Sequence, residues 1–184
     1  MDALIRLVTV ILLGSGLMPW AAMADYNFSR THYQSDSTKV AVTTSHNSKT
    51  GDAQGHFLVL SFKGSDSFAH SMIVACDPES SNNTFVMQSS ELPQTVATTG
   101  AMKVKVDNKK AHTFNSSATS QTTFGQMAAL GSGLKFHLII HELANGSQLK
   151  VTSTSNERTV EFDAKLNGLR PAIADFLQRC GLTI

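Results

Sequence analysis

Between residues 39 and 165 the sequence alternates short apolar runs with polar stretches rich in Ser, Asn, Gly and Asp. The runs KVAVTTS, HFLVLSFK, HSMIVAC and TFVMQSS start at intervals of roughly ten residues, a spacing typical of antiparallel strands joined by turns. We therefore predict a mainly β (α+β) fold, an antiparallel sandwich or partly open barrel of about eight strands.

The second half of the chain continues the pattern. AMKVKVDNKKAHTF predicts a hairpin, and RTVEFDAK predicts the last strand. LKFHLIIHEL is interpreted as the most apolar strand, with Phe136, Leu138 and Ile140 facing the core. FGQMAALGSG is ambiguous and can form a short helix. The Asn145-Gly146 pair predicts a hairpin turn.

The C-terminal stretch NGLRPAIADFLQRCG has a different period. Its apolar residues lie on one face of a helix, which we place at about 168–180. They are Leu169, Ile173, Phe176, Leu177 and Cys180. Asn167 is a candidate N-cap, Pro171 suits the first turn, and Gly181 can end the helix. We expect this helix to cover one face of the sheet.

The N-terminus has the layout of a cleavable signal peptide, residues 1–24. Leu7 to Leu13 forms a short apolar run, and Ala22-Met23-Ala24 places small residues at the two positions that a signal peptidase reads. Residues 25–38 predict an N-terminal arm or edge strand, and residues 39–184 a single β-rich domain. The aromatic residues of the arm, Tyr26, Phe28 and Tyr33, either dock a partner or fold back onto the core of the domain. The expected location is periplasmic or secreted.

Two cysteines, Cys76 and Cys180, are the only ones in the chain. An even number of cysteines in an exported chain favours a disulfide, because that compartment is oxidising. The bridge would tie the C-terminal helix to the strand that ends at Cys76. Two cysteines alone do not make a zinc site.

The formal charge is +1, from 15 Lys and Arg against 14 Asp and Glu. This balance argues against nucleic acid as a partner. No later apolar run is long enough to cross a bilayer, so we expect no transmembrane segment in the mature chain. We also expect no cofactor.

Two stretches resemble periplasmic accessory proteins associated with type VI secretion. They are SMIVACDPESSNNTFVM, residues 71–87, and the spacing F-x5-G-L-x2-A-I-x2-F-L-x2-C from Phe162 to Cys180. Together they cover about a quarter of the mature chain. Those proteins commonly carry a further cysteine-containing stretch near the mature N-terminus, which this chain lacks. The resemblance implies a non-enzymatic envelope protein that assists a larger assembly.

Four lysines form a candidate anionic-ligand patch: Lys103, Lys105, Lys109 and Lys110. Alternation places the first two on one face of a strand, where glycan or lipid headgroups could bind. The alternative interpretation is an edge hairpin whose lysines prevent strand-to-strand aggregation.

His137 and His141 are weak metal candidates, because a site needs a third ligand that the sequence does not indicate. We therefore predict no metal site and interpret them as solvent-facing strand residues. Asp66, Ser67 and His70 contain the residue types of a hydrolase triad, but they lie within one turn, so no catalytic residue is predicted.

The sequence thus favours an exported, non-enzymatic binding or accessory protein that acts through protein–protein contact. Its setting would be an envelope or secretion assembly. The alternative is an inhibitor or immunity protein of an envelope hydrolase, since such proteins are also small, exported, β-rich and disulfide-tied.

Overall fold

The computed structural model describes residues 26–33, 38–63, 69–76, 83–89, 99–118, 125–131, 133–155 and 159–182. These ranges form ten strands and two helices. The strands are β1 (Tyr26–Tyr33), β2 (Thr38–Asn47), β3 (Ala53–Lys63), β4 (Ala69–Cys76), β5 (Asn83–Ser89), β6 (Thr99–Val106), β7 (His112–Ala118), β8 (Gly125–Gly131), β9 (Gln148–Ser155) and β10 (Thr159–Lys165). The helices are α2 (Gly133–Asn145) and α3 (Arg170–Arg179). Neither described helix has the length and apolar character needed to cross a membrane.

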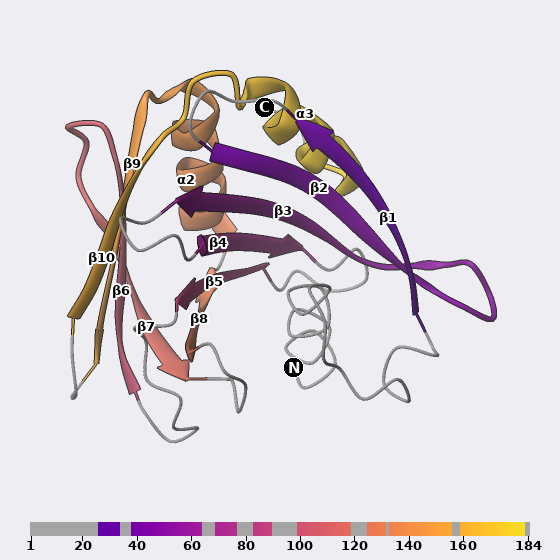
Figure 1. The fold of residues 1–184 in the computed structure, drawn as a ribbon, viewed down its shortest axis with the longest axis horizontal. Coiled ribbons are helices and arrows are strands. Elements are labelled where there is room, and N and C mark those ends of the chain that lie inside the picture. Colours follow the sequence, from indigo (N-terminus) through magenta and orange to yellow (C-terminus); the bar gives the residue numbers. More distant parts are fainter. Residues whose placement is uncertain are drawn as a thin grey trace.

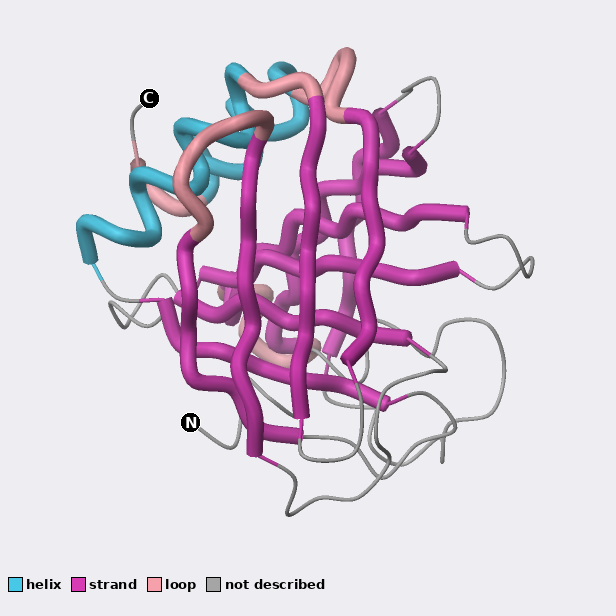
Figure 2. Tube along the Cα trace, turned by 90° about the vertical axis from the view of Figure 1, so that its left-hand side faces the viewer, coloured by secondary structure: helices cyan, strands magenta, loops and turns pink. Residues whose placement is uncertain are grey.

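All ten strands belong to one antiparallel sheet in the order β1-β2-β3-β4-β5-β8-β7-β6-β9-β10. Figures 1 and 2 show that β6, β9 and β10 run steeply across the direction of β2 to β5. The sheet turns this corner where β7 joins β8 through only three residue pairs. β1 and β10 end the strand order and are not paired with each other, so the described sheet is open.

The main core lies inside the folded sheet, between its two halves and the helices. Alternate residues of both halves point inward, among them Leu58, Val74, Val104 and Val151. His70 of β4 stacks on Phe162 of β10 with ring centroids 5.6 Å apart, so the halves meet face to face. The predicted antiparallel β fold with a C-terminal helix is therefore confirmed, although it has ten strands and a second helix.

Three phenylalanines pack together where the sheet turns. Phe85 of β5 lies 5.2 Å from Phe114 of β7 and 5.5 Å from Phe136 of α2, measured between ring centroids. The Lys135 ammonium lies 4.2 Å from the centroid of the Phe114 ring, a cation–π contact that covers the outer side of the cluster. One aromatic contact thus joins both halves of the sheet to α2.

Burial explains the two kinds of strand pattern in the sequence. In β10 the side chains alternate between exposed and buried, because one face of the strand is in water. In β3 and β4 both faces are buried, since Phe57 and Ile73 belong to a second apolar cluster on the face opposite the helices. This is why HFLVL and MIVAC read as continuous apolar runs.

The C-terminal helix forms as predicted. Ile173, Phe176 and Leu177 are buried, Pro171 lies in the first turn, and Gly181 has φ +68° just after the helix. The capping prediction is wrong, because Leu169 and not Asn167 occupies the N-cap position. Gly168 has φ +81°, so the chain turns after Asn167 and the helix begins later than predicted.

Two predicted elements exchange roles. FGQMAALGSG contains β8, and LKFHLIIHEL lies in α2. β8 pairs with β5 and β7, and this tertiary pairing overrides the helix preference of Met and Ala. In α2 the buried residues Phe136, Ile139, Ile140 and Leu143 follow the helical period, whereas Leu138 is 47% exposed.

The Asn145-Gly146 hairpin prediction is also wrong. Asn145 ends α2, and Gly146 joins this helix to β9. A Cβ atom at Gly146 would lie 2.2 Å from Cγ1 of Val106 and 2.9 Å from the carbonyl oxygen of Glu142. The glycine therefore allows close packing of the helix end against β6.

The helical period of α2 can be tested by two neighbouring substitutions. Ile139→Ala should lower the free energy of unfolding by about 2–5 kcal/mol, because it empties a fully buried position. Leu138→Ala should change it by less than about 0.5 kcal/mol, because this side chain is half exposed. Urea unfolding measures both. The reverse order would show that the segment packs as a strand.

Candidate binding edge at β1

β1 is an edge strand that pairs along its whole length. Its eight residues, Tyr26 to Tyr33, pair antiparallel with Asn47 to Val40 of β2. Its six central residues are exposed, including Phe28, which is 37% exposed. No described strand pairs with its other side. An unpaired strand edge presents backbone N–H and C=O groups that another chain can pair with.

Helix α3 holds the end of β1 through an ionic hydrogen-bond network. The Tyr33 hydroxyl donates to Oδ2 of Asp175 at 2.7 Å. Arg179 donates to both carboxylate oxygens of Asp175, from Nε at 2.8 Å and from Nη2 at 2.9 Å. This fork-on-fork geometry fixes the guanidinium and is stronger than a single contact. Residues more than 140 positions apart are thereby joined.

The same guanidinium reaches β1 and β2. Arg179 Nη2 donates to the Thr31 hydroxyl at 3.1 Å, and Nη1 donates to the Thr44 hydroxyl at 3.0 Å. Thr44 Oγ1 lies 3.0 Å from Nδ1 of His56 on β3, within hydrogen-bond distance. One arginine on α3 therefore connects three neighbouring strands, and β1 is held at a fixed position on the sheet.

The predicted disulfide lies beside this network. Cys76 and Cys180 are bonded, with Cα atoms 6.1 Å apart and 104 positions apart in sequence. Cys180 directly follows Arg179, and Cys76 is the cross-strand partner of His56. The covalent bridge and the ionic network therefore attach the same helix end to the sheet.

The network shifts the titration of its members. Burial and the hydrogen bond to Asp175 raise the pKa of Tyr33 to about 12. Burial raises the pKa of Asp175, but the hydrogen bonds from Arg179 and Tyr33 outweigh it and leave the pKa below 3.8. Burial, with the nearby charges of Arg179 and His46, lowers the pKa of His56 below 6.5. At neutral pH the network thus contains a neutral tyrosine and an ionised aspartate.

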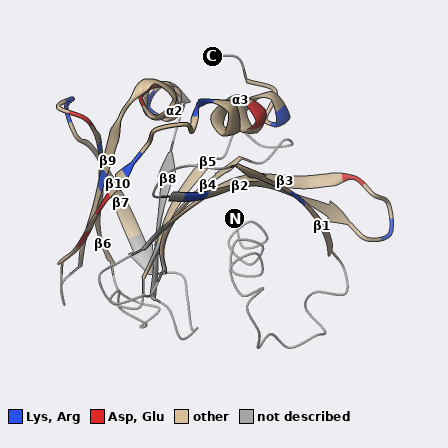
Figure 3. Ribbon diagram, turned by 45° about the horizontal axis from the view of Figure 1, so that its top comes forward, with Lys and Arg blue, Asp and Glu red and all other residues tan. Residues whose placement is uncertain are grey.

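The four lysines of the predicted anionic-ligand patch lie away from this edge. Lys103 is exposed on β6, and Lys109 and Lys110 are exposed in the segment that follows this strand. The edge-hairpin interpretation is wrong, because β6 pairs with β7 on one side and β9 on the other. Lys105 lies opposite Lys150, which forms an ion pair with Glu161 of β10. Figure 3 shows both signs of charge on these strands, so the surface is mixed.

His137 and His141 lie on α2, not on a strand. They are exposed and one helical turn apart, so their side chains project from one face. Glu142 does not join them, because it pairs with His112 of β7 at 3.1 Å. The described residues contain no group of three or more His, Cys, Asp or Glu side chains that could hold a metal.

Of the triad candidates, only His70 lies within the described residues. His70 is buried on β4, and its Nδ1 lies 2.8 Å from the Ser89 hydroxyl. Asp66 and Ser67 lie outside the described residues. Within the described chain, the buried hydroxyls of Ser116 and Ser153 have no hydrogen-bond partner. Ser116 and Ser153 therefore add unpaired polar groups to the core.

The polar network was missed by the sequence analysis. Asp175 and Arg179 at i and i+4 form a standard helix-surface ion pair, which does not by itself indicate a contact with the N-terminal strand. The aromatic residues of the N-terminal arm were the other indication in the sequence that this strand contacts something.

Comparisons with protein-family models, curated proteins and solved structures gave no match to this chain.

The role of Tyr33 can be measured by tyrosinate absorbance during an alkaline titration. The chain has two tyrosines, and Tyr33→Phe should remove the phase near pH 12. Because the folded pKa lies above the ordinary value of 10, the stabilisation by Tyr33 is complete below pH 10 and is lost as the pH rises toward 12. Loss of a phase near pH 10 would contradict the hydrogen bond to Asp175.

Removing the disulfide should loosen α3. The double variant Cys76→Ala/Cys180→Ala should lower the free energy of unfolding by about 2–4 kcal/mol, because its unfolded chain is no longer cross-linked. Urea unfolding of the variant and of the oxidised wild type measures this. Thiol titration of the wild type under denaturing conditions is the control. Equal midpoints would contradict a stabilising bridge.

Proposed function

We propose that the protein is an exported, non-enzymatic binding protein that takes up an extended segment of a partner protein along β1. The observation that carries this proposal is the eight-residue edge strand, whose outer side pairs with no described strand. Addition of a strand to a sheet edge is a recurring mode of peptide recognition, with affinity from backbone hydrogen bonds.

Anchoring makes β1 a suitable template. The strand is held by β2 along one side and by α3 at Tyr33 and Thr31. A template that is already ordered loses less conformational entropy when a partner binds. Both anchor residues lie on the α3 side of the strand, which leaves the unpaired edge and the opposite face of β1 accessible.

Export is supported by two independent features. The N-terminal segment has the composition of a cleavable signal, with an apolar run followed by Ala22-Met23-Ala24. The Cys76–Cys180 bridge suits an oxidising compartment. Together with the resemblance in residues 71–87 and 162–180, these features favour a periplasmic role in an envelope or secretion assembly.

A non-enzymatic role is supported by how the polar network around Asp175 is used. Asp175 accepts hydrogen bonds from Tyr33 and Arg179, and Arg179 also donates to Thr31 and Thr44. The ionisable side chains of this network are therefore engaged in joining α3 to the sheet.

Prolines at two adjacent positions of β1 test the proposal. Along an antiparallel edge, N–H groups point alternately toward the neighbouring strand and away from it. One of Phe28→Pro and Ser29→Pro should therefore lose a bond to β2 and stability, whereas the other should lose only an outward N–H. We expect the stable variant to lose its partner when residues 25–184 are used to capture proteins from envelope extract.

A triple Lys103→Ala/Lys109→Ala/Lys110→Ala variant is the matched control, because these lysines lie far from the β1 edge in the sheet order. It should capture the same partner as the wild type, as identified by mass spectrometry. Loss of capture in this control but not in the stable proline variant would refute the β1 proposal. A captured hydrolase that is inactive while bound would favour the inhibitor alternative.

A further inference from the structure

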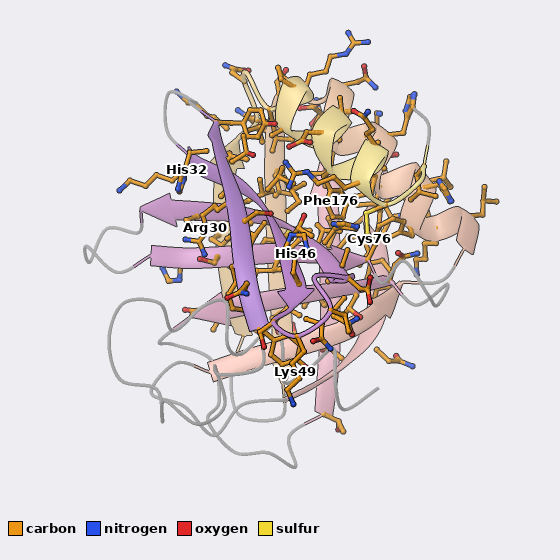
Figure 4. The ribbon with its side chains drawn as sticks, turned by 90° about the vertical axis from the view of Figure 1, so that its right-hand side faces the viewer. Arg30, His32, His46, Lys49, Cys76 and Phe176 are labelled. Atoms are coloured by element: carbon orange, nitrogen blue, oxygen red, sulfur yellow. A yellow bond between two sulfur atoms is a disulfide. The ribbon has the colours of Figure 1, made fainter. Side chains whose placement is uncertain are left out.

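The face of β1 that points away from α3 carries an aromatic and two basic residues. Phe28, Arg30 and His32 alternate along this face, opposite Ser45, Thr43 and Ala41 of β2. All three are exposed, and Lys39 extends the same face at the start of β2. Figure 4 labels Arg30 and His32 on β1. We name Arg30, His32 and Lys39 the basic edge.

The charge of the basic edge is not neutralised within the described residues. Arg30 Nε donates to the Thr43 hydroxyl at 3.2 Å, which holds the guanidinium along the sheet and leaves its terminal amino groups for other acceptors. The three ion pairs found among the described residues are His112–Glu142, Lys150–Glu161 and Arg179–Asp175. None of them includes a residue of the basic edge.

The wider surroundings have the same sign. The described residues of β1, β2, β3 and the turn between β2 and β3 contain four Lys or Arg and one acidic residue, Asp52. Four positive charges minus one negative charge leave a formal charge of +3. The β9 and β10 strands carry two lysines and two carboxylates, Glu161 and Asp163, and are neutral. The edge at β1 is therefore the one that attracts an anionic segment.

We propose that the extended segment bound by β1 is acidic, with carboxylate side chains at alternate positions that face Arg30 and His32. This inference rests on the proposed function and adds the chemistry of its partner. Side chains on one face of a strand recur every second residue, so carboxylates at i and i+2 match the spacing of 30 and 32.

Geometry and chemistry support this pairing. Cross-strand neighbours have Cβ atoms about 5 Å apart, within reach of an arginine–carboxylate pair. Guanidinium donors match the two oxygens of a carboxylate, and an imidazole N–H can donate to the next one. The next residue on the same face of the segment would then lie beside Phe28. The opposite edge, β10, carries Glu161, Asp163 and Lys165 on its exposed face, and Glu161 is paired with Lys150, so this edge gives the same segment no net attraction.

Three synthetic peptides test the inference in a fluorescence anisotropy assay with residues 25–184. They share the frame Thr-Val-X-Val-X-Val-Thr, where X is Glu, Gln or Lys. The Glu peptide should bind about tenfold tighter than the Gln peptide, the factor expected of two cross-strand ion pairs. The difference should disappear at about 1 M salt, where charges are screened within about 3 Å.

Charge reversal gives the sharper comparison. Arg30→Glu should abolish the preference for the Glu peptide and favour the Lys peptide, while Arg30→Gln should leave little preference. Lys103→Glu, on the outer face of β6, is the matched control and should keep the wild-type order of affinities. If the Arg30→Glu variant binds the three peptides in the same order of affinity as the wild type, the inference is refuted.

The outcomes separate the two proposals. If all three peptides bind with equal affinity and the stable proline variant binds none of them, the preference for an acidic segment is refuted. Strand addition at β1 is then retained. No binding of any peptide, with no partner captured, would overturn both. Analytical ultracentrifugation tests whether the protein binds itself. If it self-associates with increasing concentration and Asp163→Lys abolishes this, β1 pairs with β10 of a second copy, and the proposal of a separate partner is refuted.

Discussion

The contact of Phe85 with Phe114 and Phe136 holds together the three parts of the described core. Each ring comes from a different part: the β1–β5 half of the sheet, the β6–β10 half, and α2. A sheet that turns a corner through only three β7–β8 residue pairs needs packing to keep its halves together. α3 packs into the same core as α2 and the sheet, and α3 in turn holds β1.

The sheet was largely predictable, and the reason lies in side-chain alternation. Runs such as HSMIVAC and RTVEFDAK contain β-branched residues between turn residues, and they form β4 and β10. The segment from 125 to 145 was predicted wrongly, because short apolar stretches fit both periods. Tertiary contacts decide which structure each stretch adopts. β8 lies between β5 and β7 in the sheet, and Ile139 rather than Leu138 enters the core.

The candidate site was only partly predictable. The cysteine pairing followed from their number and the expected compartment, and the aromatic arm suggested an edge strand. The attachment of β1 to α3 depends on Tyr33 and Asp175, which lie 142 positions apart, and no local pattern connects them. The charge of the β1 face also requires the register with β2, since Lys39 joins Arg30 and His32 only when the strands are paired.

The attachment of β1 by α3 also has a consequence in time. Because a chain is synthesised from its N-terminus, β1 emerges first, whereas Asp175, Arg179 and Cys180 emerge more than a hundred residues later. Contacts between segments so distant in sequence form slowly compared with local ones. Until α3 has been synthesised, β1 is not held by this helix and Cys76 has no second cysteine with which to form the disulfide. β1 and Cys76 therefore lack their final contacts until nearly the whole chain has been made.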